Sequence, residues 1–163
     1  MSLSRVLKHL AMPDWGARRA FPPHVLAKIE QAIKASERHH DGELRFALEA
    51  GVPFHSLHLH SRKRAEDVFS HLRVWDTEHN SGVLIYVQLV DRRIEIVADR
   101  GIAAKVAQAE WDAVCRGMEA AFRKGAFLQG ALEAIQAITR ILARHFPPRG
   151  RNANELPDKP VVL

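Results

Sequence analysis

Acidic, amide and histidine side chains gather in the run from Trp75 to Gly82, Trp-Asp-Thr-Glu-His-Asn-Ser-Gly, which precedes an almost wholly apolar segment at 83–90. After a charged turn, a second run alternates apolar and charged residues and ends at Asp99-Arg100. This pattern predicts a β-hairpin. Its two strands run in opposite directions, so the start of the first lies beside the end of the second. The polar run should therefore lie near Asp99 and Arg100.

A third segment is expected to reach the same edge of the sheet. Residues 43–50 alternate between apolar and mostly charged side chains, which predicts a strand. A helix capped by Ser61 is predicted from 61 to 74, and a strand–helix–strand connection of this length favours parallel strands. The amino end of 43–50 would then add His39, His40, Asp41 and Glu43 to this edge, called the rim below.

Carboxylate and amide oxygens are the ligands of hard cations such as calcium and magnesium. We therefore predict a divalent-cation site at the rim, with calcium or magnesium as the cofactor and with the ligands Glu43, Asp76, Glu78, Asn80 and Asp99. Arg100 and Arg45 could neutralise the carboxylates, and would hold the phosphate if the protein were a phosphatase. The opposing interpretation is that these are ordinary loop residues that cap turns. Spacing alone favours the second interpretation.

Other chemistries have weaker support. His55, His58 and His60 could bind zinc, but nothing nearby supplies a fourth ligand. The single cysteine, Cys115, occupies an apolar position in a predicted helix and is expected to be a buried side chain. There is no nucleophile elbow and no phosphate-binding glycine loop. The sequence therefore assigns no residue to catalysis, and whether the protein is an enzyme stays open.

Composition limits the class of protein. The 163 residues are 47% hydrophobic and 26% charged, as in a globular domain. No apolar run approaches the roughly 18 residues that a membrane span needs, and no signal peptide is recognised, so a soluble, cytoplasmic protein is expected. The net charge of +5 is scattered. The clusters Arg62-Lys63-Arg64 and Arg92-Arg93 contain no aromatics and are interpreted as solvated faces, so nucleic-acid binding is not expected.

The element order predicts an α/β fold in which a small mixed sheet, a parallel pair plus an antiparallel hairpin, has helices on both faces. Helices are expected at 2–11, 22–38, 61–74, 102–124 and 126–145. The chain divides into an N-terminal helical arm (1–20), a domain (21–146) and an extended tail (147–163). From residue 151 onward no periodicity is found, and the tail is either a strap over the body or a mobile segment.

The ordered set of motifs resembles the TPM domain family, which includes a thylakoid-lumen phosphatase-like protein and many bacterial proteins. The resemblance rests on Gly42-Glu43-Leu44, on Asn80 to Val87, on the turn at Asp91-Arg92-Arg93 with the strand after it, and on Phe122 to Phe127. It implies a three-layer α/β/α sandwich. It also implies divalent-cation binding and, from a plant member, acid phosphatase activity.

Ala98-Asp99-Arg100-Gly101 departs from the family pattern, because many relatives have a glycine-rich segment there. The leading expectation is therefore a soluble module that binds a ligand or a protein partner and carries a divalent-cation site at the rim. The alternatives are a metal-assisted phosphatase that acts on phosphate esters and a structural adaptor that works through its C-terminal tail.

Overall fold

The computed structural model describes residues 14–53, 56–150 and 153–163. The helix predicted at 2–11, which forms most of the N-terminal arm, lies outside the described residues. The elements in chain order are α2 (Asp14–Ala20), α3 (Pro23–Ser36), β1 (Glu43–Glu49), α4 (Ser61–His71), β2 (Gly82–Gln88), β3 (Arg93–Ala98), α5 (Arg100–Ala103), α6 (Gln108–Arg123), α7 (Phe127–His145) and β4 (Val161–Val162).

The four strands form one sheet in the order β3-β2-β1-β4. β1 and β2 are parallel, with Glu43 opposite Gly82, and β2 and β3 form an antiparallel hairpin. The predicted hairpin and the predicted parallel pair are both confirmed. β3 lies at one edge of the sheet, as its alternating pattern indicated, and the short β4 lies at the other edge, parallel to β1.

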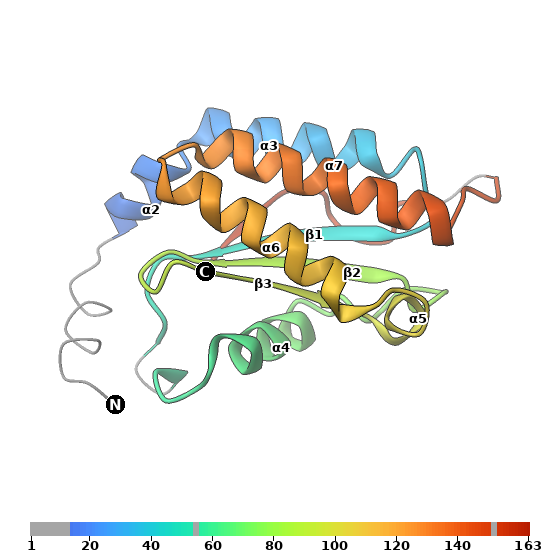
Figure 1. The fold of residues 1–163 in the computed structure, drawn as a ribbon, viewed down its shortest axis with the longest axis horizontal. Coiled ribbons are helices and arrows are strands. Elements are labelled where there is room, and N and C mark those ends of the chain that lie inside the picture. Colours follow the sequence, from blue (N-terminus) through green and yellow to red (C-terminus); the bar gives the residue numbers. More distant parts are fainter. Residues whose placement is uncertain (1–13, 54–55, 151–152) are drawn as a thin grey trace.

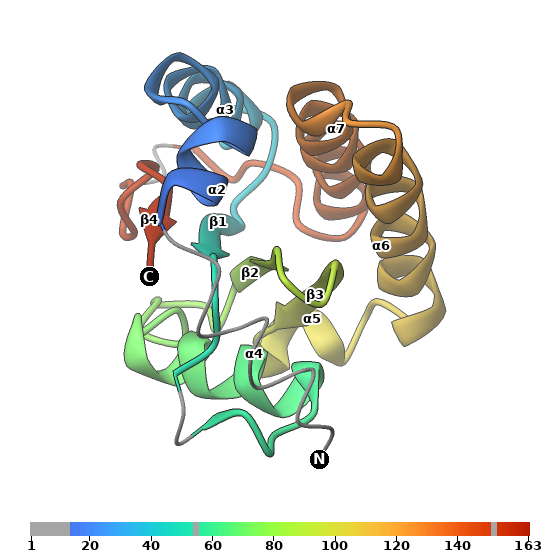
Figure 2. The same cartoon turned by 90° about the vertical axis from the view of Figure 1, so that its left-hand side faces the viewer.

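Helices cover both faces of the sheet, so the predicted α/β/α sandwich is confirmed (Figure 1). α3, α6 and α7 lie on one face and α4 on the other (Figures 1 and 2). Successive side chains of a strand point to opposite faces, and the core follows this period. The larger cluster, beneath α3, α6 and α7, contains Leu44, Phe46, Leu48, Val83, Ile85, Val87, Ile94 and Ile96. The smaller cluster, beneath α4, contains Ala47, Leu84, Tyr86 and Val97.

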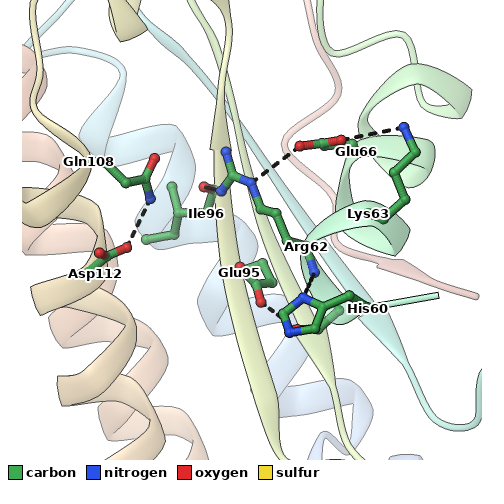
Figure 3. A network of polar contacts seen from close by, with 9 residues as sticks. His60, Arg62, Lys63, Glu66, Glu95, Ile96, Gln108 and Asp112 are labelled. Atoms are coloured by element: carbon green, nitrogen blue, oxygen red, sulfur yellow. Dashed lines mark hydrogen bonds and ion pairs between the residues drawn. The ribbon is translucent and has the colours of Figure 1, made fainter.

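α4 is attached to the hairpin by polar contacts (Figure 3). Nδ1 of His60 accepts a hydrogen bond from the backbone N–H of Arg62 at 3.4 Å, so His60, and not Ser61, is the cap of this helix. The Ser61 hydroxyl instead donates to the Glu95 carboxylate at 2.6 Å. The Arg62 guanidinium donates to the Ile96 carbonyl at 2.6 Å, which covers a backbone acceptor of the edge strand.

The arginine cluster of α4 is therefore only partly a solvated face. Lys63 is exposed, but Arg64 turns toward the sheet and donates through Nε to the buried Glu49 carboxylate at 3.2 Å. The Tyr86 hydroxyl donates to the same carboxylate, and burial raises the pKa of Tyr86 above its usual range. A buried carboxylate is costly unless it is paired and hydrogen-bonded. These two donors explain how a charged residue is accommodated in a strand that is buried on both faces.

Apart from shifts of one to three residues at helix ends, two helical regions differ from the sequence prediction. No helix was expected at 14–20, where α2 forms. The helix predicted at 102–124 is in fact two helices, the four-residue α5 and then α6, separated by a turn at Ala104 to Ala107. No glycine or proline marks this turn, since the run is rich in alanine, and its position follows from the packing of Ile102 and Val106 into the core.

The tail after Gly150 crosses the edge of β1. Val161 pairs with Ala47, the Leu163 N–H donates to the Leu48 carbonyl at 2.9 Å, and Leu156 is buried against the smaller core cluster. Of the two alternatives left open by the sequence, residues 153–163 take the form of a strap. Within the described ranges, no helix has the length and apolar character that crossing a bilayer requires.

Candidate functional site

The rim is formed where the loop before β2 meets the start of α5. The Gly101 N–H donates to the Asn80 carbonyl at 3.2 Å, and a Cβ placed at Gly101 would lie 2.6 Å from that oxygen. A Cβ at Gly82 would lie 1.9 Å from the Val74 carbonyl oxygen. Only glycine permits backbones to approach this closely. The juxtaposition of the polar run with Asp99 and Arg100 is thus present, and these two glycines make it sterically feasible.

Two of the five predicted metal ligands are buried and engaged by the fold. Glu43 is 1% exposed and its carboxylate accepts the Leu156 N–H at 3.1 Å, while burial raises the pKa of Glu43. Asp99 is 8% exposed and caps α5, since its Oδ1 accepts the Arg100 N–H at 2.7 Å. Its Oδ2 is buried and has no hydrogen-bond partner among the described residues. The Asp99 carboxylate is the one predicted ligand with an unsatisfied inner oxygen.

The other three predicted ligands lie nearer to solvent. Asp76 is exposed and pairs with Arg73 at 3.1 Å. Glu78 is exposed, and its backbone N–H donates to the Glu155 carboxylate at 2.8 Å. Asn80 has a positive φ of 51° and accepts from the Arg100 guanidinium at 2.8 Å. The structure therefore joins Asn80 to Arg100 but does not gather the five predicted ligands around one point.

The two predicted phosphate-binding arginines differ in availability. Arg100 is exposed, and its Nε is held by Asn80. Arg45 is 6% exposed and lies under the tail, where its guanidinium donates to the carbonyls of Pro157 and Lys159. Arg45 thus holds the strap in place, and its guanidinium faces the carbonyls of the strap instead of the rim hollow.

Two adjoining hollows open at the rim, and they share Asp41, Glu78, His79 and Arg149. We call them together the rim hollow. One part, of about 370 Å³, is completed by Asn80, Gly101, Lys105 and Phe146. The other, of about 290 Å³, is completed by Gly150, Ala153 and Glu155. The carboxylates of Asp41, Glu78 and Glu155 therefore share the hollow with the cations of Lys105 and Arg149.

Contacts inside the rim hollow already partly satisfy its charges. The Arg149 N–H donates to the Asp41 carboxylate at 3.1 Å, and the Arg149 guanidinium lies 4.0 Å from the same carboxylate. The Lys105 ammonium lies 4.5 Å from the centre of the Phe146 ring, in a cation–π contact. Across residues 14–53, 56–150 and 153–163, no three His, Cys, Asp or Glu side chains are grouped so as to hold a metal ion.

His40, expected at the rim, points into the fold. Its Nδ1 accepts the Gly42 N–H at 3.2 Å, so Nε2 carries the proton and donates to the Ser36 hydroxyl at 2.8 Å. Ser36 lies 2.6 Å from the Thr139 hydroxyl, which in turn donates to the Ile135 carbonyl. Burial lowers the pKa of His40 to about 4. The sequence could not distinguish this buried histidine from its exposed neighbour His39.

The remaining candidates of the sequence show no reactive arrangement. Burial raises the pKa of the Cys115 thiol to about 12, which makes it a poor nucleophile at neutral pH. His60 is used as the cap of α4 and His58 is exposed, while His55 lies outside the described residues.

Fold and comparisons together define the class of protein. The family model of the TPM domain matches residues 19–141, and the chain belongs to this family. The NMR structure of the BA42 protein from the psychrophilic bacterium Bizionia argentinensis is similar, with 31% identity and a TM-score of 0.77 over 86% of this chain and 93% of that one. The N-terminal domain of a protein from P. gingivalis, at 15% identity, has a TM-score of 0.59 over 74% of this chain and 76% of its own and shares the fold. No curated protein matches the sequence.

Proposed function

We propose that this TPM domain is a binding module whose ligand site is the rim hollow, and that the ligand is a divalent cation. The observation that carries the proposal is that three carboxylates from separate segments, Asp41, Glu78 and Glu155, line one hollow of about 290 Å³. The Glu78 N–H holds the Glu155 carboxylate at 2.8 Å, so the loop before β2 and the tail meet at this site.

The chemistry of these donors favours calcium. All three are carboxylate oxygens, which hard cations prefer. The described side chains do not converge as they stand, so binding requires Glu78 and Glu155 to rotate toward Asp41. Both side chains are exposed, and the rotation of Glu155 must either keep or break the hydrogen bond that its carboxylate accepts from the Glu78 N–H. Calcium accepts six to eight ligands in flexible geometry, whereas magnesium demands a near-ideal octahedron, so an adaptable site selects calcium.

This ligand set revises the one expected from the sequence. Glu78 is common to both sets. Asp41 and Glu155 replace Glu43 and Asp76. The Glu43 carboxylate accepts the Leu156 N–H of the strap, and Asp76 pairs with Arg73. Asp99 remains a separate candidate, since its inner oxygen is unsatisfied among the described residues.

Thermal unfolding of the chelator-stripped protein tests the proposal, with calcium, magnesium, manganese and zinc each added in turn. A ligand that binds only the folded state stabilises it by about 2.7 kcal/mol at 100 times its Kd. We expect calcium to raise the Tm of the wild type and of Asp76→Asn, and to lose this effect in Glu78→Gln and Glu155→Gln. Asp76→Asn is the matched control, because Asp76 is exposed and lies outside the hollow.

Two outcomes would contradict the assignment. If no metal shifts the Tm, the hollow is not a cation site. If the shift survives Glu78→Gln but disappears in Asp99→Asn, the cation binds at the buried Asp99 carboxylate instead.

A metal-assisted phosphatase is a second candidate function, and the positions of Lys105 and Arg149 favour it. Both cations line the rim hollow beside the carboxylates and would hold a phosphoryl group. A bound metal would polarise the phosphoryl oxygen and activate water. Turnover of a generic phosphate ester that is abolished by chelation and by Lys105→Met would support it. Activity that survives both changes would indicate a contaminant.

An adaptor that acts through its tail is a third candidate, supported by the exposed apolar side chains of Val162 (52%) and Leu163 (39%). The double variant Val162→Ser, Leu163→Ser should lose partner capture and retain the fold. Deletion of 151–163 is a poorer test, because it would also leave Glu43 and Arg45 without their backbone partners. Capture that is unchanged in the double variant would contradict this function.

A further inference from the structure

A second cavity, of about 310 Å³, lies at the opposite end of the sheet from the rim hollow. We call it the hairpin-end pocket. It is bounded by α2, by the β2–β3 hairpin and by the turn between α6 and α7. Figure 2 faces this end of the molecule and shows the hairpin between α2 and α6. The volume falls at the lower limit of small-molecule pockets, about 300–1,000 Å³.

The wall of the pocket is apolar and partly aromatic. Val87 and Ile94 come from the hairpin, and Phe122 and Phe127 come from the ends of α6 and α7. The two phenylalanine rings are 5.1 Å apart and both pack against Phe21. Yet both rings remain half-buried, whereas Phe21 and Phe46 behind them are fully buried. This wall would gain contacts from an apolar ligand.

The mouth of the pocket carries an excess of positive charge. Arg92, Arg93 and Arg123 line it, and the one carboxylate in the lining is that of Glu119, 3.2 Å from Arg123. Among the residues that the structure describes, no carboxylate pairs with the guanidinium of Arg92 or Arg93. Charges of one sign at the entrance of an apolar cavity complement a ligand with an apolar body and an anionic head.

The backbone conformation at Arg92 determines how the inference can be tested. Its φ is +52°, in the left-handed region, where glycine or asparagine would be favoured. Arg73, which lies outside the pocket, has a similar φ, so this backbone feature bears on the choice of variant and control and not on the ligand.

The pocket and the rim hollow lie at opposite ends of the sheet. The carboxyl end of β2 lies at the pocket, through Val87 to Leu89. The rim hollow, in contrast, lies at the amino ends of β1 and β2.

We infer that the hairpin-end pocket binds a small carboxylate with an apolar body, such as a short acyl chain or a single aromatic ring. The apolar part contacts Val87, Ile94 and the two phenylalanines, and the carboxylate faces Arg92 and Arg123. This site is separate from the rim hollow and does not depend on the cation proposed there.

Titration of the ¹⁵N-labelled full chain with octanoate, followed by NMR, tests the inference. We expect saturable shifts at residues 87–94 and 122–127, and weaker binding of octan-1-ol, which has the same chain without the charge. Because an exposed ion pair contributes about 0.2–1 kcal/mol, Arg92→Asn should weaken octanoate binding by up to about fivefold. The same variant should unfold at an equal or higher temperature, since asparagine suits a positive φ.

Arg73→Asn is the matched control. Arg73 also has a positive φ, of 55°, and is exposed, but it lies at the end of α4 and does not line the pocket. It should leave octanoate binding unchanged.

Three results would overturn the inference. The first is no binding at millimolar octanoate, as would follow if another part of the chain filled the pocket. The second is equal binding of octan-1-ol. The third is an equal loss in Arg92→Asn and Arg73→Asn, which would mean that only the net charge of the protein matters.

Discussion

The two ends of the sheet differ in how far the fold satisfies their polar groups. At the rim, backbones approach closely at Gly82 and Gly101. The buried charged groups of Glu43 and Arg45 are hydrogen-bonded to backbone groups of the strap. At the hairpin end, the cavity keeps an apolar wall, and Arg92 and Arg93 have no carboxylate partner within the described part of the chain. The charged side chains of the rim therefore serve mainly to hold the fold together, through hydrogen bonds to the strap.

This contrast teaches that a cluster of charged residues and an available site are different things. A buried carboxylate satisfied by backbone N–H groups stabilises the fold and has little left to offer a ligand. In the proposed cation site, two of the three carboxylates, those of Glu78 and Glu155, are exposed, and the third, Asp41, is 9% exposed. The following predictions test how tightly each end is constrained.

The largest effect is expected from Gly82→Ala. The added Cβ would lie 1.9 Å from the Val74 carbonyl oxygen, which is backbone and cannot move aside cheaply. We expect a loss of at least about 3 kcal/mol in the free energy of unfolding, measured with urea. Gly117→Ala is the control, because a Cβ there would meet no described atom within 4 Å apart from its own stretch of α6. It should stabilise α6 by about 0.5–1 kcal/mol. Equal effects at the two sites would refute the close approach at the rim.

Glu37→Gln tests a partly buried acid at the end of α3, near Asp158 of the strap. Burial raises the pKa of Glu37 to about 9, and the nearby carboxylates of Glu43 and Asp158 add to the effect. The folded protein therefore holds a proton that the unfolded chain has lost above about pH 4.5, so stability falls as the pH rises from about 4.5 toward 9. Glutamine mimics the protonated acid and removes this loss.

Urea titrations at pH 5 and pH 8 measure the difference. At pH 8 we expect Glu37→Gln to be more stable than wild type by on the order of 2 kcal/mol, with little difference at pH 5. The exposed Glu133→Gln should show no such dependence. A gain that is the same at both pH values would contradict the protonated state of Glu37 in the folded protein.

His40→Gln tests the buried histidine at the start of β1. Because burial lowers the pKa of His40 to about 4, the unfolded chain takes up a proton first as the pH falls below about 6.5. Stability contributed by the neutral ring is complete above that pH and is lost between about 6.5 and 4. Between pH 7 and pH 4.5 the wild type should lose on the order of 1–2 kcal/mol more than His40→Gln. His24→Gln, at an exposed position of α3, should behave as the wild type.

Much of the fold could be predicted because two periodicities dominate it. The alternation in 43–50 and in the second hairpin strand, together with the apolar run at 83–90, locates all three long strands to within two residues. The tail strand β4 could not be predicted, because two paired residues carry no period. α2 was missed because Pro13 and Gly16 interrupt any helical pattern.

The candidate sites were harder to predict than the fold. The sequence placed Glu78 and Asn80 at the rim. It could not show that the Glu43 carboxylate would accept a hydrogen bond from the N–H of Leu156, more than a hundred residues away. The hairpin-end pocket left only separate signals, Arg92-Arg93 and Phe122 to Phe127. Whether these two segments lie side by side depends on how α6 packs across the hairpin, and no local sequence pattern predicts this packing.

The smallest effect is expected from Ala20→Leu, at the hairpin end. Ala20 is half-buried and lines the pocket, so the larger side chain enters existing space and adds apolar contacts. We expect a change of less than about 1 kcal/mol in either direction, together with the loss of octanoate binding. Ala131→Leu makes the same change in the closely packed core beneath α7, where Ala131 is 0% exposed, and should cost about 1–3 kcal/mol. If both variants were equally destabilised, the hairpin end would be packed as tightly as the core and would have no room for a ligand.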